Sequence, residues 1–201
     1  MKQLLLDIQP PAPQTLDNFI VGQNAEAIHS IKQALTGAVE ARFIYFWGIS
    51  GSGKSHLLNA CKSANITVAD DVHLLNNDNQ IALFNAYNHI KETGGALITA
   101  GLHAPKQMRL RDDLSTRLAW GLVYQLQPLT DEEKTQALKT HALARGMKLP
   151  DEVVDYCLRY LRRDLPTLMA VLDALDVWSL TEKKPVTVPM LKKLLQMDLD
   201  I

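Results

Sequence analysis

The glycine-rich loop at residues 48–55 constrains this chain more than any other feature. It reads GISGSGKS and follows FIYFW at residues 43–47, a run typical of a buried strand, while residues 56–62 suit a helix. The spacing Gly-x4-Gly-Lys-Ser turns backbone N–H groups and a helix start toward an anion, which is how a P-loop binds nucleotide phosphates. A Gly/Ser surface turn followed by a lysine is the alternative, and the flanking strand and helix patterns disfavour it.

Each residue type in this loop has an expected role. Lys54 is expected to reach the β- and γ-phosphates, and the hydroxyl of Ser55 to hold Mg²⁺. The nucleotide is ADP or ATP, and the loop does not distinguish between them. The loop residues expected to contact it are Gly48, Gly51, Ser52, Gly53, Lys54, Ser55 and His56.

Two adjacent acids follow the next apolar run. Residues 65–69 read NITVA, a short buried strand, and Asp70 and Asp71 come directly after it. A P-loop requires an acid at such a place, so Asp70 is expected in the Mg²⁺ shell and Asp71 to orient an attacking water. Without the P-loop, two acids in a turn would be the better interpretation. The 15 residues between Lys54 and Asp70 suffice for one helical crossover and leave no room for another strand and helix.

The other segments alternate between helix and strand before the chain becomes wholly helical. We expect helices at 24–40, with Asn24 as N-cap, and at 79–92, and strands at 96–101 and 118–126. This alternation predicts an α/β fold with a parallel, doubly wound sheet and a ligand at the carboxyl ends of its strands. From Thr130 onward, N-terminal signals at 130–133, 150–152, 165–166 and 187 predict four helices.

The composition is that of an ordinary folded protein without a strong overall charge. The 201 residues are 47% hydrophobic, and a net charge of −1 gives no general attraction to DNA or to an anionic membrane. No apolar run approaches the roughly 20 residues of a membrane span, and no signal peptide is evident. We therefore expect a cytoplasmic protein with reduced, buried Cys61 and Cys157. No histidine pair has the spacing of a metal site, so Mg²⁺ is the only metal expected.

An apolar tip begins the chain. Residues 3–8 read QLLLDI, and the stiff spacer QPPAP at 9–13 follows them. Such a tip is typical of a short linear motif that docks into an apolar groove of a partner, although a tail packed on the protein's own surface is the alternative. We therefore predict a motif and spacer at 1–13, a nucleotide-binding α/β domain at 14–128 and a helical domain at 129–201.

Taken together, the order of these segments resembles AAA+ proteins of the DnaA branch. The resemblance is carried by the P-loop, the acids at 70–71, the segment LSTRLAWG at 114–121 and a helical lid after it. The chain is most similar to the Hda family, regulatory inactivators of the bacterial replication initiator DnaA, over nearly its whole length and most densely at 114–173. The implied fold is an AAA+ parallel-sheet domain that lacks one strand-helix unit, followed by a small helical lid.

The resemblance implies roles that spacing alone does not. Residues 16–22, with Phe19 and Val21, would wrap the adenine, and Arg117 matches an arginine finger that acts in trans on ATP held by DnaA. Initiation would thereby be switched off. The missing strand-helix unit removes a segment that contacts single-stranded DNA in the initiator, and no helix-turn-helix domain is expected after the lid. The residues matching the family's binding motif for the sliding clamp, the β subunit of DNA polymerase III, are Gln3, Leu4, Leu6 and Ile8.

Two positions depart from the family pattern. Gly101 stands where the polar sensor-1 residue would be, although Thr99 could partly substitute for it. Pro166 stands where the sensor-2 arginine would be, with Arg162 and Arg163 close by in sequence. Weak or no hydrolysis by the chain itself is therefore expected.

Alternatives remain open for the function and for the arginine. A DNA-remodelling or clamp-loader-like ATPase subunit is the competing function, which the balanced charge and the altered sensor positions disfavour. A homodimer is possible. Arg117 could instead form a surface salt bridge with Asp112 or Asp113, worth at most about 1 kcal/mol.

Overall fold

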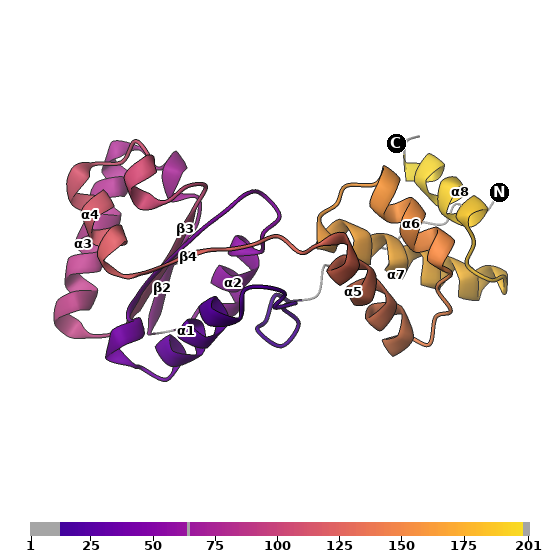
Figure 1. The fold of residues 1–201 in the computed structure, drawn as a ribbon, viewed down its shortest axis with the longest axis horizontal. Helices are drawn as coiled ribbons and strands as arrows, with labels where there is room; N and C mark the ends of the chain where they lie inside the picture. The colour runs from indigo at the N-terminus through magenta and orange to yellow at the C-terminus, as the bar shows by residue number, and fades with distance from the viewer. Residues whose placement is uncertain (1–12, 64, 199–201) are drawn as a thin grey trace. The chain divides into compact units, whose positions relative to one another are not determined.

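The computed structural model describes residues 13–63 and 65–198, which form two compact units. One unit is Pro13–Leu129, and the other begins at Thr130 (Figure 1). The proposed clamp-binding residues at 3–8 lie outside the described residues. In the part of the chain that the structure describes, no helix is both long enough and apolar enough to cross a membrane.

The first unit contains a parallel sheet of four strands in the order β2-β3-β1-β4. Its strands are β1 Phe43–Trp47, β2 Ile66–Ala69, β3 Ala96–Gly101 and β4 Leu122–Gln125. One helix, α2 Lys54–Cys61, makes the crossover from β1 to β2. The α/β class is confirmed, and so is the reduced sheet with its short crossover.

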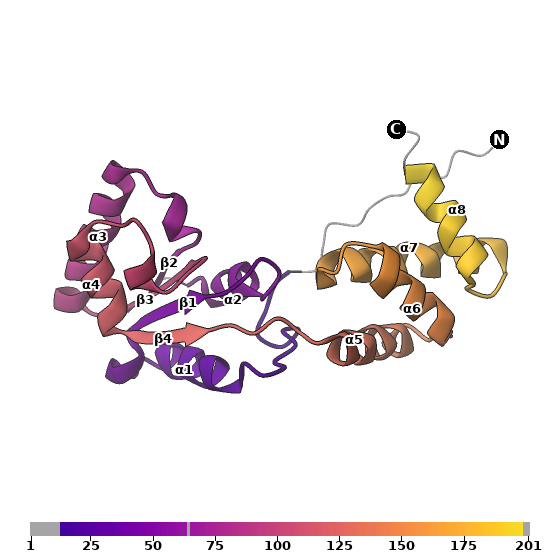
Figure 2. The ribbon, with the colours of Figure 1, turned by 45° about the horizontal axis from the view of Figure 1, so that its top comes forward.

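Helices cover both faces of this sheet (Figures 1 and 2). Helices α1 Ala25–Leu35 and α2 lie on one face, and helices α3 Asn77–Thr93 and α4 Asp112–Trp120 lie on the other. Side chains alternate along a strand, so Ile44 and Phe46 enter the core beneath α1 and α2, while Tyr45 enters the opposite core. Because both faces are covered, β1 is a continuous apolar run.

Two predicted boundaries were wrong. The first helix ends at Leu35, before Gly37 at φ +82°, and a 3-10 turn at Val39–Ala41 replaces its last residues. Residues 118–120 belong to α4 and not to the last strand, because Leu118 joins Leu114 on a helical face that is buried against the sheet. Two further 3-10 turns, Val72–Leu74 and Pro105–Gln107, precede α3 and α4.

Asn24 occupies the N-cap position of α1, but its side chain makes no capping hydrogen bond. Its Nδ2 donates to the carbonyl of Gln127 at 2.9 Å, and the Gln127 N–H donates to its Oδ1 at 2.8 Å. This buried pairing fastens the segment before α1 to the segment after β4. The expected cap is therefore a bridge between two distant parts of the chain.

The helical unit contains α5 Asp131–Ala144, α6 Asp151–Tyr160, α7 Leu165–Glu182 and α8 Val188–Asp198 (Figure 2). All four start where the sequence signals predict. Thr130 forms the expected capping box with Glu133, at 3.2 and 2.8 Å. The unit has its own core around Leu138, Leu168 and Leu172. Both cysteines are free and buried, Cys157 in this core and Cys61 beneath the sheet of the first unit.

Candidate nucleotide site and arginine pocket

The P-loop connects the end of β1 to the start of α2, and its shape requires glycine at two positions. A Cβ on Gly48 would lie 2.6 Å from the Leu126 carbonyl oxygen, and a Cβ on Gly53 would lie 2.7 Å from Cε2 of Phe19. Both residues also adopt positive φ, at +152° and +93°. Only glycine fits both positions, so the loop can take this tight shape at the start of a helix, where backbone N–H groups can bind a phosphate.

Lys54 is only 9% exposed and is held by its own loop. Its ammonium donates to the carbonyls of Gly48 and Ile49, at 2.7 and 2.9 Å. Burial lowers the pKa of Lys54, and the negative charges of Asp70 and Asp71 act in the opposite direction. The ammonium group of Lys54 thus lies at the loop, and phosphate oxygens could replace the two carbonyl oxygens as its hydrogen-bond acceptors.

A second feature of the loop fits a phosphate ligand. The hydroxyl of Ser52 is buried and has no hydrogen-bond partner among the described residues. A buried hydroxyl without a partner is costly, and a phosphate oxygen would satisfy it. Ser55, at the first turn of α2, is exposed and offers the hard oxygen ligand that Mg²⁺ prefers.

The two acids lie directly after β2, on the same edge of the sheet as the P-loop, because all four strands are parallel. Asp71 adopts the left-handed conformation, with φ +47°, and its N–H donates to Oδ1 of Asp70 at 2.8 Å. This conformation is uncommon for a residue other than glycine and is frequent at functional sites. Asp70, the first residue after β2, remains the expected second oxygen ligand for Mg²⁺.

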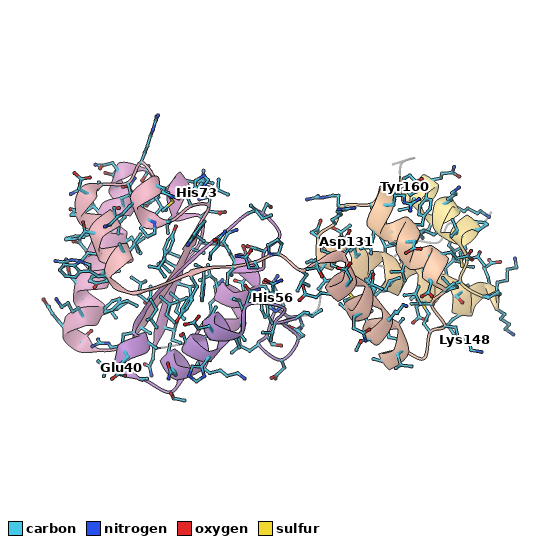
Figure 3. All side chains as sticks on the ribbon, in the orientation of Figure 1. Glu40, His56, His73, Asp131, Lys148 and Tyr160 are labelled. Atoms are coloured by element: carbon cyan, nitrogen blue, oxygen red, sulfur yellow. The ribbon has the colours of Figure 1, made fainter. Side chains whose placement is uncertain are left out.

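The predicted adenine segment packs on the start of α2. The rings of Phe19 and His56 meet edge to face, with centroids 5.2 Å apart, and a ring nitrogen of His56 lies 2.8 Å from the Thr15 carbonyl. His56 is labelled in Figure 3. Val21, two residues after Phe19 in the sequence, is partly exposed. The structure thus brings Phe19 and His56 to the P-loop, at Gly53.

The side chain of Tyr45 fills the space beside Gly101, the position expected for the first sensor. A Cβ on Gly101 would overlap the hydroxyl of Tyr45, which donates to the His103 carbonyl at 2.7 Å. Burial raises the pKa of Tyr45, so this hydroxyl stays protonated as a donor. Thr99, the residue expected to substitute in part, is buried within the sheet, and its hydroxyl donates to the Ile44 carbonyl at 3.4 Å.

The second sensor position is a helix start in the other unit. Pro166 lies in the first turn of α7, where the missing N–H of proline costs nothing, and Asp164 caps that helix through the Thr167 N–H at 3.0 Å. Arg163 donates to the Leu158 carbonyl at 3.1 Å, and Arg162 lies 3.4 Å from Asp164. Both arginines therefore already have partners within the lid.

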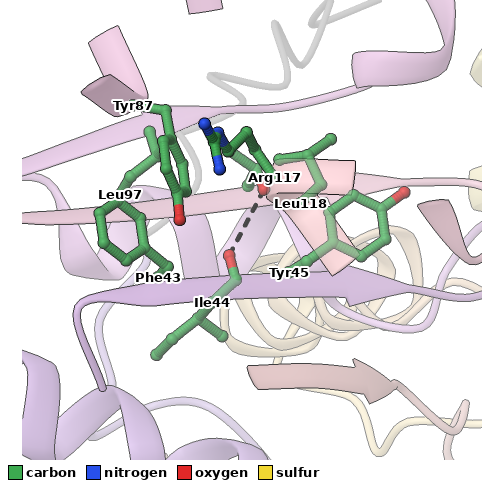
Figure 4. A pocket seen from close by; sticks show the side chains of 8 residues that line it. Phe43, Ile44, Tyr45, Tyr87, Leu97, Arg117 and Leu118 are labelled. Atoms are coloured by element: carbon green, nitrogen blue, oxygen red, sulfur yellow. Dashed lines mark hydrogen bonds between the residues drawn. The ribbon is translucent and has the colours of Figure 1, made fainter. Parts of the chain in front are cut away.

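Arg117 lies in an aromatic pocket on the face of the sheet that α3 and α4 cover (Figure 4). Its guanidinium carbon is 4.8 Å from the ring centroid of Trp120, 5.8 Å from that of Tyr87 and 6.0 Å from that of Phe84. Among the described residues it forms no ion pair, and Asp113 pairs with Arg111 at 2.8 Å. A salt bridge from Arg117 to a neighbouring aspartate is therefore not what the structure shows.

This pocket lies over the amino halves of β1 and β3, whereas the P-loop follows the carboxyl end of β1. Phe43, which lines it, is the first residue of β1, whereas the P-loop begins after the last residue, Trp47. The four steps from Phe43 to Trp47, at about 3.3 Å each, span about 13 Å. Gly121, just after α4, packs against the backbone of Phe43 and fixes the helix end at the start of β1. Arg117 is thus remote from the nucleotide site of its own chain.

A comparison with protein families decides the nature of the helical unit. Residues 131–195 match the family described as "Hda, lid domain". The helical unit is an Hda lid domain. The first unit has the fold of a DnaA domain, so the chain is similar to Hda in its lid and to DnaA in its fold.

Solved structures support the fold of the whole chain. Domain III of the replication initiation protein DnaA from Thermotoga maritima is similar over 93% of this chain and 98% of its own, with 22% identity and a TM-score of 0.74. AMPPCP-bound DnaA from Aquifex aeolicus matches over 85% of this chain and 68% of its own, with 22% identity and a TM-score of 0.66. A RuvB variant from Thermotoga maritima matches over 92% and 72%, with 16% identity and a TM-score of 0.63. The fold is therefore AAA+.

Sequence reasoning missed two residues of the site region. Tyr45 is one of several aromatic residues in an apolar run, and nothing local indicates that its hydroxyl meets Gly101 across the sheet. Trp120, by contrast, could have been noticed, because it lies three residues after Arg117 and such residues are neighbours on a helix.

Proposed function

We propose that this Hda-like protein regulates DNA replication initiation by promoting hydrolysis of ATP bound to the initiator DnaA. The observation that carries the proposal is the position of Arg117. It is a partly exposed arginine without an ion-pair partner among the described residues, and its pocket lies over the amino half of β1, away from the chain's own P-loop. A cation in that position is suited to the nucleotide of another subunit.

The chemistry of such a finger is electrostatic. During hydrolysis, negative charge is distributed over the oxygens of the transferred γ-phosphoryl group, and an arginine supplied in trans stabilises that charge. The planar guanidinium offers several donors in a fixed geometry that matches phosphate oxygens. Arg117 would contribute this group to the ATP of DnaA, while the attacking water and the metal belong to the site of DnaA.

The chain's own nucleotide site has a different role in the proposal. Gly48, Ser52 and Lys54 would hold the phosphates of ADP or ATP, which Ser55 and Asp70 would link to Mg²⁺. Analogy supports an adenine nucleotide, because DnaA from Aquifex aeolicus binds AMPPCP. Gly101 and Pro166 supply no sensor side chains, so slow hydrolysis is expected here and Asp71 has little effect on it. The bound nucleotide then acts mainly as a structural ligand.

The sliding clamp is the proposed anchor. Gln3, Leu4, Leu6 and Ile8 would bind the clamp after it is loaded on DNA, and this binding would bring the protein close to the initiator. The support is the sequence of the motif and the proline spacer that follows it. A DNA-remodelling ATPase is less well supported, because both sensor positions lack the polar groups that turnover would use.

The test measures conversion of initiator-bound ATP to ADP in the presence of DNA-loaded clamp. Arg117→Ala is expected to abolish the stimulation, and Arg117→Lys to remove most of it, because an in trans finger is worth roughly 10³- to 10⁵-fold in rate. The matched control is Arg109→Ala, which removes an exposed arginine that precedes α4. Stimulation by Arg117→Ala at the rate of the parent protein would refute the proposal.

A further inference from the structure

Within the described part of the chain, Arg117 has no ion pair, although an aspartate is suitably spaced on its own helix. Asp113 precedes it by four residues on α4, and an acid four residues before a base is the favoured order for a helical ion pair. Asp113 instead accepts two hydrogen bonds from Arg111, from Nε at 3.2 Å and from Nη2 at 2.8 Å. This bidentate pair, which lowers the pKa of Asp113, occupies the carboxylate that Arg117 could otherwise use.

Arg111 is itself fixed by a buried glutamine. The N–H of Arg111 donates to Oε1 of Gln80 at 2.9 Å, and Nε2 of Gln80 donates to the Leu75 carbonyl at 2.9 Å. Gln80 is only 8% exposed and belongs to α3. The backbone of Arg111 is therefore anchored where its side chain can reach the first turn of α4.

Trp120 holds the guanidinium of Arg117 in a different way. Its ring is the nearest of the three aromatic rings, at 4.8 Å, and it remains 65% exposed. The face of an aromatic ring attracts a cation without using the in-plane N–H donors of a guanidinium. Those donors stay available, whereas a carboxylate partner would occupy them.

We propose that Arg111 and Trp120 are positioning residues for Arg117. Arg111 pairs with Asp113 and so leaves Arg117 without an ion pair, and the ring of Trp120 keeps the guanidinium oriented. The inference rests on the proposed function, because it assumes that Arg117 acts on a phosphate of another subunit. A partner's phosphate oxygens then replace weak ring contacts and need not displace a carboxylate. Neither residue contacts the phosphate in this scheme.

Charge replacement tests the role of Arg111. In the full chain, with DNA-loaded clamp and ATP-bound initiator, Arg111→Ala is expected to lower the stimulated rate about threefold, because the freed Asp113 pairs with Arg117. Arg111→Ala combined with Asp113→Asn should restore the parent rate, since an amide does not hold the cation. A merely structural role for Arg111 would not be rescued by that second change, so failure of the rescue overturns its positioning role.

A conservative replacement tests the role of Trp120. Trp120→Ala is expected to lower the maximal rate roughly tenfold with little change in the protein concentration needed for half stimulation, while Trp120→Phe keeps most of the rate. Tyr160→Ala is the matched control, because Tyr160 is a similarly exposed aromatic residue, at 64%, in the lid. A parent rate for Trp120→Ala, or equal loss in the control, overturns the role of Trp120.

A spectroscopic measurement separates this inference from the proposed function. The Nε–H signal of Arg117 in a ¹H–¹⁵N spectrum, assigned by its loss in Arg117→Ala, should show a ring-current shift that disappears in Trp120→Ala and persists in Trp120→Phe. If Arg117→Ala stimulates hydrolysis normally, the proposed function fails, and this inference fails with it. If Arg117→Ala is inactive while the signal and the rate are unaffected in the Trp120 and Arg111 variants, only this inference fails.

Discussion

Adding one methyl group at Gly101 should destabilise the first unit, because Tyr45 already occupies the space. The new Cβ would overlap the Tyr45 hydroxyl, and it would lie 3.1 Å from Cγ2 of Val72 and 3.3 Å from Sδ of Met108. Tyr45 is 1% exposed, so its rigid ring is enclosed by neighbouring side chains. Inserting a methyl group into so full a site costs about 1–3 kcal/mol.

The hydrogen bond of Tyr45 adds to that cost. Any shift of the ring weakens the bond from its hydroxyl to the His103 carbonyl, which is 2.7 Å long and worth about 1 kcal/mol. Gly101→Ala should therefore lower the free energy of unfolding by about 2–4 kcal/mol, and Tyr45→Phe alone by about 1 kcal/mol. The double variant removes the overlapping atom, so its loss should be smaller than the sum by about 1–2 kcal/mol.

Urea unfolding of the four proteins of this double-mutant cycle measures the coupling, with the transition of the first unit followed by the fluorescence of Trp47 and Trp120. The lid carries its own tryptophan, Trp178, so the comparison needs circular dichroism as a second probe. Unchanged stability of Gly101→Ala, or losses that simply add in the double variant, would show that Tyr45 does not exclude a side chain here. A supportive result would also mean that a sensor residue could be introduced at 101 only with a smaller residue at 45.

Three further predictions concern the ligand, the clamp and the thiols. Lys54→Ala should abolish binding of ADP, so that ADP at a hundredfold excess over Kd, which stabilises the parent by about 2.7 kcal/mol, no longer raises the melting temperature of the variant; equal melting curves of the parent with and without ADP would contradict this. Replacing Gln3, Leu4 and Leu6 by alanine should abolish clamp binding in surface plasmon resonance and leave the melting temperature unchanged. Burial raises the pKa of Cys61 and Cys157 from 9.0 to about 11. Below pH 9 the thiols are protonated in the folded and the unfolded protein, whereas between about pH 9 and 11 only the unfolded thiols ionise, so the free energy of unfolding should fall in that range. This part of the fall should be absent when both residues are alanine.

Local signals made the lid and the nucleotide loop predictable. The capping residues at Thr130 and the proline at 166 indicate helix starts through interactions within a few residues, and these starts agree with the structure. The P-loop is similar, because its glycines are required by the shape of the loop itself. Residues 96–101 form a strand that is buried along its whole length, and the sequence shows it as a continuous apolar run.

Features that depend on distant partners were not predictable from one sequence. Asn24 has the residue type of an N-cap, but its side chain bonds Gln127, which is 103 residues away. The apolar run at 118–126 was interpreted as one strand, because periodicity does not show that Leu118 faces a core that α3 helps to form. The choice of Asp113 between Arg111 and Arg117 likewise depends on Gln80, which fixes Arg111 from another helix.

The reduced sheet retains every strand that the two candidate sites use. β1 leads to the P-loop at one end and begins in the arginine pocket at the other, β2 ends at Asp70 and β3 ends at Gly101. The connection from β1 to β2 is the one that lacks a strand-helix unit. Because β2 lies at the edge of the sheet, the missing unit alters that edge and not the central strands. Because β1 joins both sites, a nucleotide that stabilises the folded unit also stabilises the strand on which the pocket of Arg117 is built. Bound nucleotide would thus stabilise the pocket of Arg117 without being hydrolysed.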